Sequence, residues 1–224
     1  MTTRPLLLGH RGARAEKTIP ENTLDSFDLA LAQGCDGFEF DVRLSADGQP
    51  VICHDAEFRG LEIARCSAQQ LALPLLGDVL RRYQKTAFLD IELKVAGLEA
   101  VTLDLLQAYP PARGCVISSF LPEVLKKLHV MDAALSLGVI CETPAQFKLW
   151  SQLPIDYVIP HKSLATRSAI TEIQRAGKKV LVWTVNSIRE ITQFAEWRAD
   201  GIISDDTEKL VWAVGHGSDR SQRD

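Results

Sequence analysis

The sequence predicts a single (β/α)8 TIM barrel, in which eight parallel strands alternate with helices. Two observations support this prediction: strand-like and helix-like segments alternate along the chain, and its 224 residues are a usual length for one barrel. A third is that no glycine-rich nucleotide motif marks an open doubly wound sheet. We expect one domain over residues 1–214, followed by a polar tail over 215–224.

The strands are expected where apolar and β-branched residues run between turn residues. Their ranges are 6–10, 37–44, 87–94, 115–119, 136–141, 157–160, 180–185 and 201–204. Helices are expected between them, among others over 122–131, 144–153, 166–176 and 188–197. At the first helix, Asn22 is expected to cap the start and Gly34 to end it.

Two places interrupt this alternation. Asp47-Gly48 is a turn signal, so the second strand is expected to continue into a hairpin that raises His54 above the barrel rim. The connection from Asp55 to Lys85 is the longest in the chain. It shows only one convincing helix, over residues 76–83.

The second and third strands carry acidic residues at alternate positions. Glu39 and Asp41 share one face of the second strand, and Glu92 lies on the third. In a barrel wrapped by helices the apolar face packs outward, so these carboxylates point inward. Burying unpaired carboxylates is costly, and three together need a shared cation. Oxygen ligands without a thiolate favour Mg²⁺ or Ca²⁺ over Zn²⁺.

Further polar residues are expected at the same mouth, where the strands of such barrels end. His10 and Arg11 follow the first strand, and Lys94 ends the third. His10 and His54 can exchange protons near neutral pH. Arg11 and Lys94 supply positive charge that suits the oxygens of a phosphate group. Together these residues indicate metal-assisted phosphoryl transfer.

Eight short motifs follow one another along nearly the whole chain. They are His10-Arg11-Gly12, Pro20-Glu21-Asn22-Thr23, Glu39-Phe40-Asp41, His54-Asp55, Ile91-Glu92-Leu93-Lys94, Ser119-Phe120, Trp183-Thr184-Val185-Asn186 and Asp200-Gly201-Ile202. In this order they resemble the motifs of the glycerophosphodiester phosphodiesterase family. The resemblance implies a TIM barrel that hydrolyses glycerophosphodiesters, such as glycerophosphocholine or glycerophosphoethanolamine, to sn-glycerol 3-phosphate and an alcohol.

The resemblance also implies a role for each site residue. The metal ligands would be Glu39, Asp41 and Glu92, the acid–base pair His10 and His54, and the phosphate clamp Arg11 and Lys94. We further expect Phe120 and Trp183 to form an apolar wall against the glycerol carbons. It stays open which histidine is the acid, and whether a glycerol hydroxyl attacks first to give a cyclic phosphate or water attacks directly.

Four alternatives compete with this interpretation. A related phospholipase D-type enzyme would share the metal site but act on lipids, and it would need an exposed apolar or basic rim that this acidic chain does not indicate. The carboxylates could form a structural ion-pair network with Arg11, Lys94 and Arg43. Lys94 could form a Schiff base in an aldolase or isomerase, although three nearby carboxylates would keep it protonated. A barrel that binds a phosphodiester without turnover would lack a histidine or a carboxylate, and none is missing here.

Composition limits the partners. The formal net charge of −4, with no run of like charges, argues against nucleic-acid binding and against a polybasic membrane surface. A small-molecule substrate fits better. No apolar stretch reaches the length of a membrane span, and the five scattered cysteines suit reduced thiols, so we expect a cytoplasmic protein without stable membrane insertion. The oligomeric state is not determined by the sequence.

Overall fold

The computed structural model describes residues 4–216, and within this range eight parallel strands close into the predicted barrel. The barrel strands are β1 (Leu6–His10), β2 (Gly37–Leu44), β6 (Phe88–Leu93), β7 (Cys115–Ser119), β8 (Leu137–Cys141), β9 (Tyr157–Pro160), β10 (Lys179–Val182) and β11 (Gly201–Ser204). Because β1 pairs in parallel with both β11 and β2, the sheet closes on itself.

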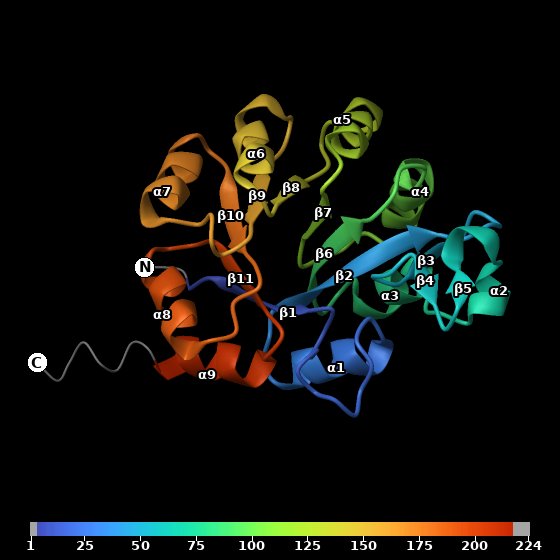
Figure 1. The fold of residues 1–224 in the computed structure, drawn as a ribbon, viewed down its shortest axis with the longest axis horizontal. Helices are drawn as coiled ribbons and strands as arrows, with labels where there is room; N and C mark the ends of the chain where they lie inside the picture. The colour runs from blue at the N-terminus through green and yellow to red at the C-terminus, as the bar shows by residue number, and fades with distance from the viewer. Residues whose placement is uncertain (1–3, 217–224) are drawn as a thin grey trace, which may run out of the picture.

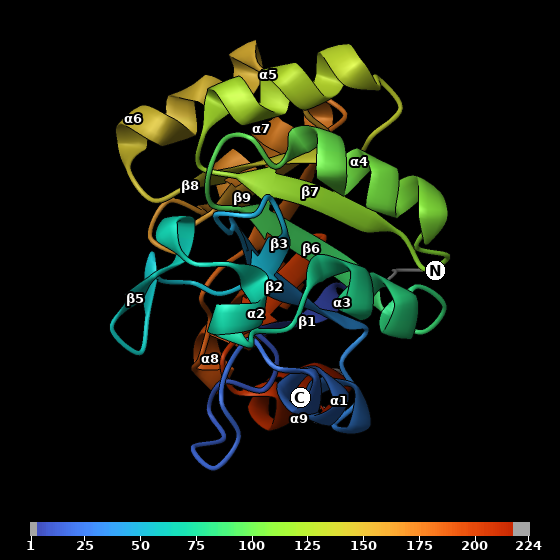
Figure 2. The same cartoon turned by 90° about the vertical axis from the view of Figure 1, so that its right-hand side faces the viewer.

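Helices surround the strands on the outside of the barrel (Figures 1 and 2). They are α1 (Leu24–Ala32), α3 (Leu76–Tyr83), α4 (Glu99–Ala108), α5 (Pro122–Met131), α6 (Pro144–Phe147) continued by a 3-10 turn (Lys148–Gln152), α7 (Arg167–Arg175), α8 (Ile188–Glu196) and α9 (Thr207–His216). No helix in residues 4–216 is both long enough and apolar enough to cross a membrane. The last eight residues of the expected tail, 217–224, lie outside the described residues.

Most strand boundaries lie within one residue of the prediction, but two boundary residues were predicted wrongly. β10 ends at Val182 instead of continuing to residue 185. The cap of α1 is Thr23, whose hydroxyl accepts a hydrogen bond from the Ser26 amide, and not Asn22. Asn22 instead adopts a left-handed φ of 58° and donates its side-chain amide to Asp41. Asn22 therefore binds the buried carboxylate of Asp41, although the local sequence pattern predicts that it caps the helix.

The long connection after β2 forms an excursion at one side of the barrel (Figure 2). The predicted hairpin is present, because β3 (Pro50–Ile52) pairs antiparallel with β2. The expectation of a single helix in the connection is wrong. It also contains β4 (Glu57–Phe58), β5 (Leu61–Glu62), a 3-10 turn (Ile63–Arg65) and α2 (Ala68–Leu71). These elements of two to four residues are too short for periodicity to reveal.

The alternation along β2 separates two layers of the fold. Outward-facing Phe38 stacks on Phe27 of α1 with ring centroids 4.2 Å apart, and it forms an edge-to-face pair with Tyr83 of α3 with ring centroids 5.0 Å apart. Inside the barrel, apolar residues fill the space below the mouth, among them Leu8, Phe88, Val116, Tyr157 and Leu181. The acidic residues of β2 therefore stand above a filled core, at the open end of the barrel.

Candidate active site at the barrel mouth

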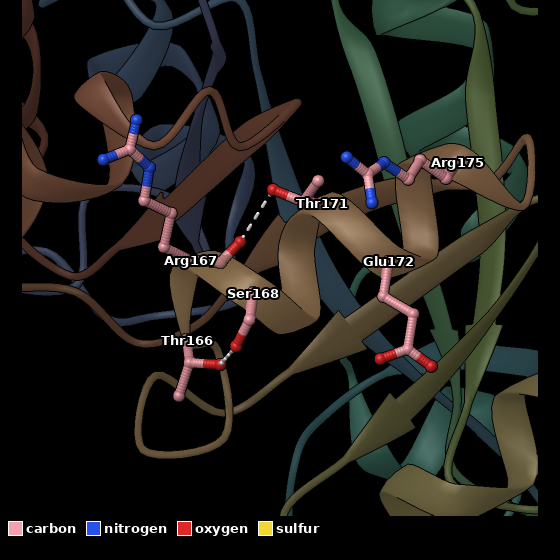
Figure 3. A pocket seen from close by; sticks show the side chains of 6 residues that line it. All are labelled: Thr166, Arg167, Ser168, Thr171, Glu172 and Arg175. Carbon is pink, nitrogen blue, oxygen red and sulfur yellow. Dashed lines mark hydrogen bonds between the residues drawn. The ribbon is translucent and has the colours of Figure 1, made fainter.

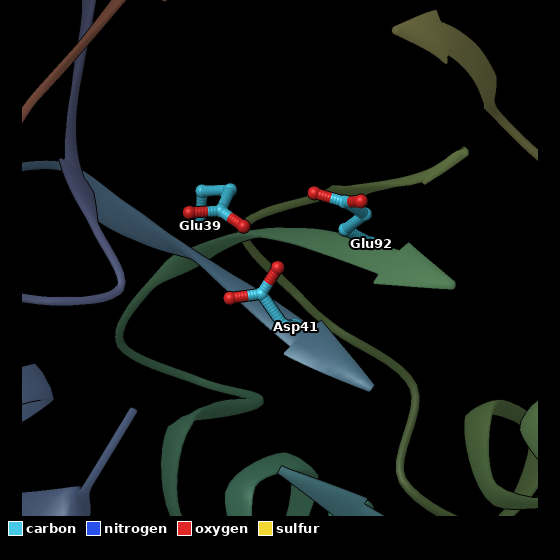
Figure 4. Close-up of side chains that lie close together, drawn as sticks. All are labelled: Glu39, Asp41 and Glu92. Carbon is cyan, nitrogen blue, oxygen red and sulfur yellow. The ribbon is translucent and has the colours of Figure 1, made fainter. Parts of the chain in front are cut away.

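Three carboxylates from neighbouring strands converge at the mouth, as predicted. Glu39 and Asp41 extend from β2 and Glu92 from β6, and their side chains point toward one another (Figure 4). One oxygen from each lies within 4.8 Å of the others, and all three residues are buried. Oxygens that share one Ca²⁺ can lie up to about 5 Å apart. The predicted inward orientation of the carboxylates is confirmed.

The pKa values of the three carboxyl groups are shifted by burial and by the neighbouring charges. Burial, together with Asp41, Glu92 and Asp90, raises the pKa of Glu39 well above its usual range. Burial and Asp41 raise the pKa of Glu92 to about 7. Burial also opposes ionisation of Asp41, but Lys94 and Arg11 overcome it and lower the pKa of this carboxyl. One oxygen of Glu39 accepts no hydrogen bond within the described residues. Three buried carboxylates with an oxygen free to act as a ligand fit a divalent cation.

Two cationic side chains contact the cluster. Lys94 Nζ lies 2.7 Å from Glu92 Oε1 and 3.3 Å from Asp41 Oδ1. Arg11 Nε lies 3.2 Å from Asp41 Oδ2, and its guanidinium also pairs with Glu21 at 2.7 Å. Burial by itself would lower the pKa of Lys94, but Glu92 and Asp41 raise it above the usual value. A lysine held in its charged form is a poor Schiff-base nucleophile, which counts against the aldolase alternative.

His10 is held at the edge of the cluster by a residue that the sequence did not single out. Its Nε2 lies 3.8 Å from Glu39 Oε2, and its Nδ1 lies 2.7 Å from Asp205 Oδ1. Arg14 and Asn186 in turn donate hydrogen bonds to Asp205 at 3.1 and 2.7 Å. Asp205 directly follows β11, so the strand-end rule that identified the other site residues also applies to it.

The excursion brings His54 to the same pocket. Its Nδ1 lies 2.7 Å from Asp55 Oδ1, and its backbone carbonyl accepts a hydrogen bond of 2.8 Å from Arg43 Nε. The side chain is 36% exposed, which leaves it accessible from solvent. His10 and His54 thus approach the pocket from different elements, each with a carboxylate at Nδ1.

The pocket at the mouth has a volume of about 400 Å³ and mixes charged and apolar walls. Phe120, after β7, and Trp183, after β10, meet edge to face with ring centroids 5.8 Å apart. Lys94 Nζ lies 5.7 Å from the centre of the Phe120 ring. The other lining residues are His10, Arg11, Glu39, His54, Asp90, Glu92, Ile140, Glu142, Ile159 and Ile203. Hence all of the predicted site residues except Asp41 line this pocket. Asp41 lies behind them and forms ion pairs with Arg11 and Lys94, which do line it.

Asp90 lies on the same face of its strand as Glu92 but one pleat deeper, and from the sequence we expect it to pair with Lys94 or with a backbone donor. The structure differs: the hydroxyl of Ser118 on β7 donates a hydrogen bond to Asp90 at 2.5 Å. Burial raises the pKa of Asp90 to about 7. The neighbouring strand supplies this partner, so spacing within β6 does not reveal it.

Comparison with known proteins agrees with this geometry. The chain matches the glycerophosphoryl diester phosphodiesterase family over residues 10–73 and 86–209. It is 26% identical to a glycerophosphodiester phosphodiesterase of Caldanaerobacter subterraneus, an alignment that covers 96% of this chain and 99% of that protein.

Two solved structures have the same fold. A phosphodiesterase of Oleispira antarctica, in complex with the product sn-glycerol-3-phosphate, has a TM-score of 0.84 and 27% identity, covering 95% of this chain and 97% of the other. A glycerophosphodiester phosphodiesterase of Thermotoga maritima has a TM-score of 0.81 and 22% identity, covering 94% and 98%. Fold and site therefore define a barrel enzyme of phosphodiester hydrolysis. The chain belongs to the glycerophosphoryl diester phosphodiesterase family, and its enzyme class is glycerophosphodiester phosphodiesterase.

Proposed function

We propose that the enzyme hydrolyses glycerophosphodiesters, such as glycerophosphocholine or glycerophosphoethanolamine, to sn-glycerol 3-phosphate and an alcohol, with one divalent cation, Mg²⁺ or Ca²⁺. One observation carries this proposal: three buried carboxylates within 4.8 Å of one another adjoin a pocket that two histidines and two cationic side chains also line. The product bound to the Oleispira antarctica relative supports a glycerol phosphate on the substrate side. A pocket of about 400 Å³ suits a small molecule.

Glu39, Asp41 and Glu92 would hold the cation. When bound, the cation would neutralise charge on the phosphate and lower the pKa of an attacking hydroxyl. Arg11 and Lys94 have more N–H donors than their carboxylate partners occupy, so they can also bind the phosphate oxygens. Phosphate binding by these two residues would hold the phosphorus atom beside the carboxylate cluster.

His10 and His54 would transfer the two protons that the reaction requires. In both residues a carboxylate at Nδ1 orients the ring and favours a proton on that nitrogen, so Nε2 remains for proton transfer. One histidine accepts a proton from the attacking hydroxyl, and the other donates a proton to the leaving alkoxide. Phe120 and Trp183 would pack against the glycerol carbons and exclude water from them.

The attacking oxygen belongs either to the glycerol moiety or to water. Attack by the glycerol hydroxyl gives a cyclic phosphate first, and water then opens the ring. Direct attack by water gives sn-glycerol 3-phosphate in one step. Phosphorus NMR during turnover separates the two routes, because only the first produces a transient cyclic phosphate.

Release of sn-glycerol 3-phosphate from glycerophosphocholine, measured with and without EDTA, tests the proposed function. We expect release by the untreated enzyme, loss of release in EDTA, and recovery when Mg²⁺ or Ca²⁺ is added in excess. Release that is unchanged after complete removal of divalent cations would contradict the proposed role of the carboxylates. Comparison of the two added cations also identifies the one that supports turnover.

We also propose a cytoplasmic location. All five cysteines are free thiols, and Cys35, Cys53 and Cys141 are buried, as expected for reduced thiols that serve as small apolar residues. Fractionation of cells followed by immunodetection tests this, and recovery of the protein outside the cytoplasmic fraction would contradict it.

A further inference from the structure

One buried carboxylate of the mouth has no role in the reaction as described so far. Asp90 lies on β6 two residues before Glu92, so both face the barrel interior and Asp90 lies one layer deeper. The strand register places it beside Glu39 of β2. Asp90 is 1% exposed, yet it is one of the residues that line the pocket. It is not among the three carboxylates that converge on a possible cation.

The two oxygens of Asp90 differ in their surroundings. Oδ1 accepts the hydrogen bond from the Ser118 hydroxyl, whereas Oδ2 accepts none within the described residues. The ammonium group of Lys94 is paired with Glu92 and Asp41 instead. A buried acceptor without a donor costs free energy, so this site favours a ligand that brings a donor.

On β8, β9 and β11, by contrast, the strand residues that line the pocket are apolar. Ile140, Ile159 and Ile203 line it, and each is at most 5% exposed. A ligand arm that reaches this floor must be largely apolar and must end in one hydrogen-bond donor. A short carbon chain that ends in a hydroxyl has this chemistry.

We propose that Asp90 Oδ2 accepts a hydrogen bond from the terminal hydroxyl of the substrate's glycerol moiety, and so selects glycerol over an arm without that hydroxyl. This inference rests on the proposed function. Two residues along a strand are about 6.6 Å apart, which is comparable with the reach of a three-carbon arm below the phosphate. The carbons of the arm would contact the isoleucines, and the hydroxyl would reach the carboxylate between them.

The test compares two phosphate monoesters by calorimetry: sn-glycerol 3-phosphate, and the propane-1,2-diol 1-phosphate that lacks only the terminal hydroxyl. The same pair is then compared in turnover, as the phosphocholine diesters. We expect the wild-type enzyme to prefer the glycerol compounds by about 10- to 100-fold, the range for leaving a buried acceptor without its hydrogen bond. Asp90→Leu, of similar shape, should reduce this preference to about 3-fold or less, and it should leave binding of the deoxy compound nearly unchanged.

Two further variants distinguish recognition from a structural role. Asp90→Asn keeps a polar group at the same position and should give an intermediate preference for the glycerol compounds. If circular dichroism shows that Asp90→Leu does not fold, Asp90→Asn takes its place in the test. Ser118→Ala removes only the hydrogen bond to the other oxygen and should keep most of the preference. An equal loss for both compounds in Asp90→Leu and Asp90→Asn overturns the proposal, as does a wild-type enzyme that binds both equally. Binding that discriminates without any turnover would instead contradict the proposed function alone.

Discussion

The barrel mouth and the outer surface of α7 are both hollowed, but they differ in what lines them. The hollow over α7 is the larger, about 880 Å³ against about 400 Å³ for the mouth. Its lining comes from one helix and its cap residue (Figure 3): Thr166, Arg167, Ser168, Thr171, Glu172 and Arg175. The mouth is lined by residues of six barrel strands, by residues that follow these or the other two strands, and by His54 of the excursion.

The hydrogen bonds of the two places differ in the same way. On α7 they are local: the hydroxyls of Thr166 and Ser168 lie 3.0 Å apart, and Thr171 donates to the Arg167 carbonyl at 2.9 Å. Most of these side chains are exposed, so water satisfies what remains. At the mouth, charged groups that are distant in sequence are buried together, and some of their oxygens accept no hydrogen bond from any residue in the range 4–216. Convergence of buried charge, rather than volume, therefore distinguishes the candidate functional site.

Replacement of either histidine of the barrel mouth should cause the largest loss of activity. We expect His10→Ala and His54→Ala each to lower kcat by about 10²- to 10⁴-fold, since each removes one proton transfer. Thermal unfolding should change little. His161→Ala is a suitable control, because His161 lies beside Trp183 at the rim without lining the pocket, and it should keep kcat within about 3-fold. Near-normal turnover by both histidine variants would refute the proposed pair.

Removal of one charge from the carboxylate cluster should have the next largest effect. We expect Glu92→Gln to lower activity by about 10²- to 10³-fold, the loss typical of removing one electrostatic contact to the reacting group. In the wild type, Mg²⁺ or Ca²⁺ should raise the unfolding temperature, because an ion that binds only the folded state stabilises it. This increase should be smaller in the variant.

The matched control is Glu172→Gln in the α7 hollow, which removes the same charge from an exposed position. Its activity and its response to the cation should equal those of the wild type. If the cation raises the unfolding temperature of Glu92→Gln as much as that of Glu172→Gln, the cation does not bind at the mouth.

Asp205→Asn should have a moderate effect. It keeps the shape of the residue that holds His10 Nδ1 but not its charge, and we expect a decrease in kcat of about 10- to 100-fold with little change in KM, the range known for partners that orient a histidine. A change confined to KM would contradict a positioning role.

The same substitution should alter the pH dependence of stability. Burial opposes ionisation of Asp205, but its hydrogen bonds from His10, Asn186 and Arg14 lower its pKa below the usual value. A carboxyl whose pKa is lower in the folded state stabilises the fold above the unfolded pKa of about 4, and this contribution is lost as the pH falls through the lower folded value. Urea unfolding should therefore show a destabilised variant at pH 7, and a smaller difference from the wild type below about pH 4.

The smallest effect is expected on α7 itself. Arg167→Gln and Arg175→Gln change exposed side chains, so activity should stay within about 2-fold and the free energy of unfolding within about 0.5 kcal/mol. A large loss of activity in either variant would show that the outer hollow also serves the reaction.

Much of the site could be predicted because a strand alternates its side chains between two faces. Glu39, Asp41 and Glu92 occupy alternate positions of neighbouring strands, so their common inward direction follows from the sequence alone. His10 and Lys94 follow from the rule that strand ends meet at one mouth. His54 follows from the turn at Asp47-Gly48, which predicts the hairpin before it.

The sequence by itself thus determined the barrel, the inward direction of its acidic residues and the end at which they meet, because periodicity and turn residues act over short distances along the chain. Only the tertiary structure decided which groups are partners: Asn22 binds Asp41 rather than a helix end, Ser118 binds Asp90, and Asp205 holds His10. Donors and acceptors find each other across strands that are distant in sequence, and a buried charge takes whichever donor the closed barrel places beside it.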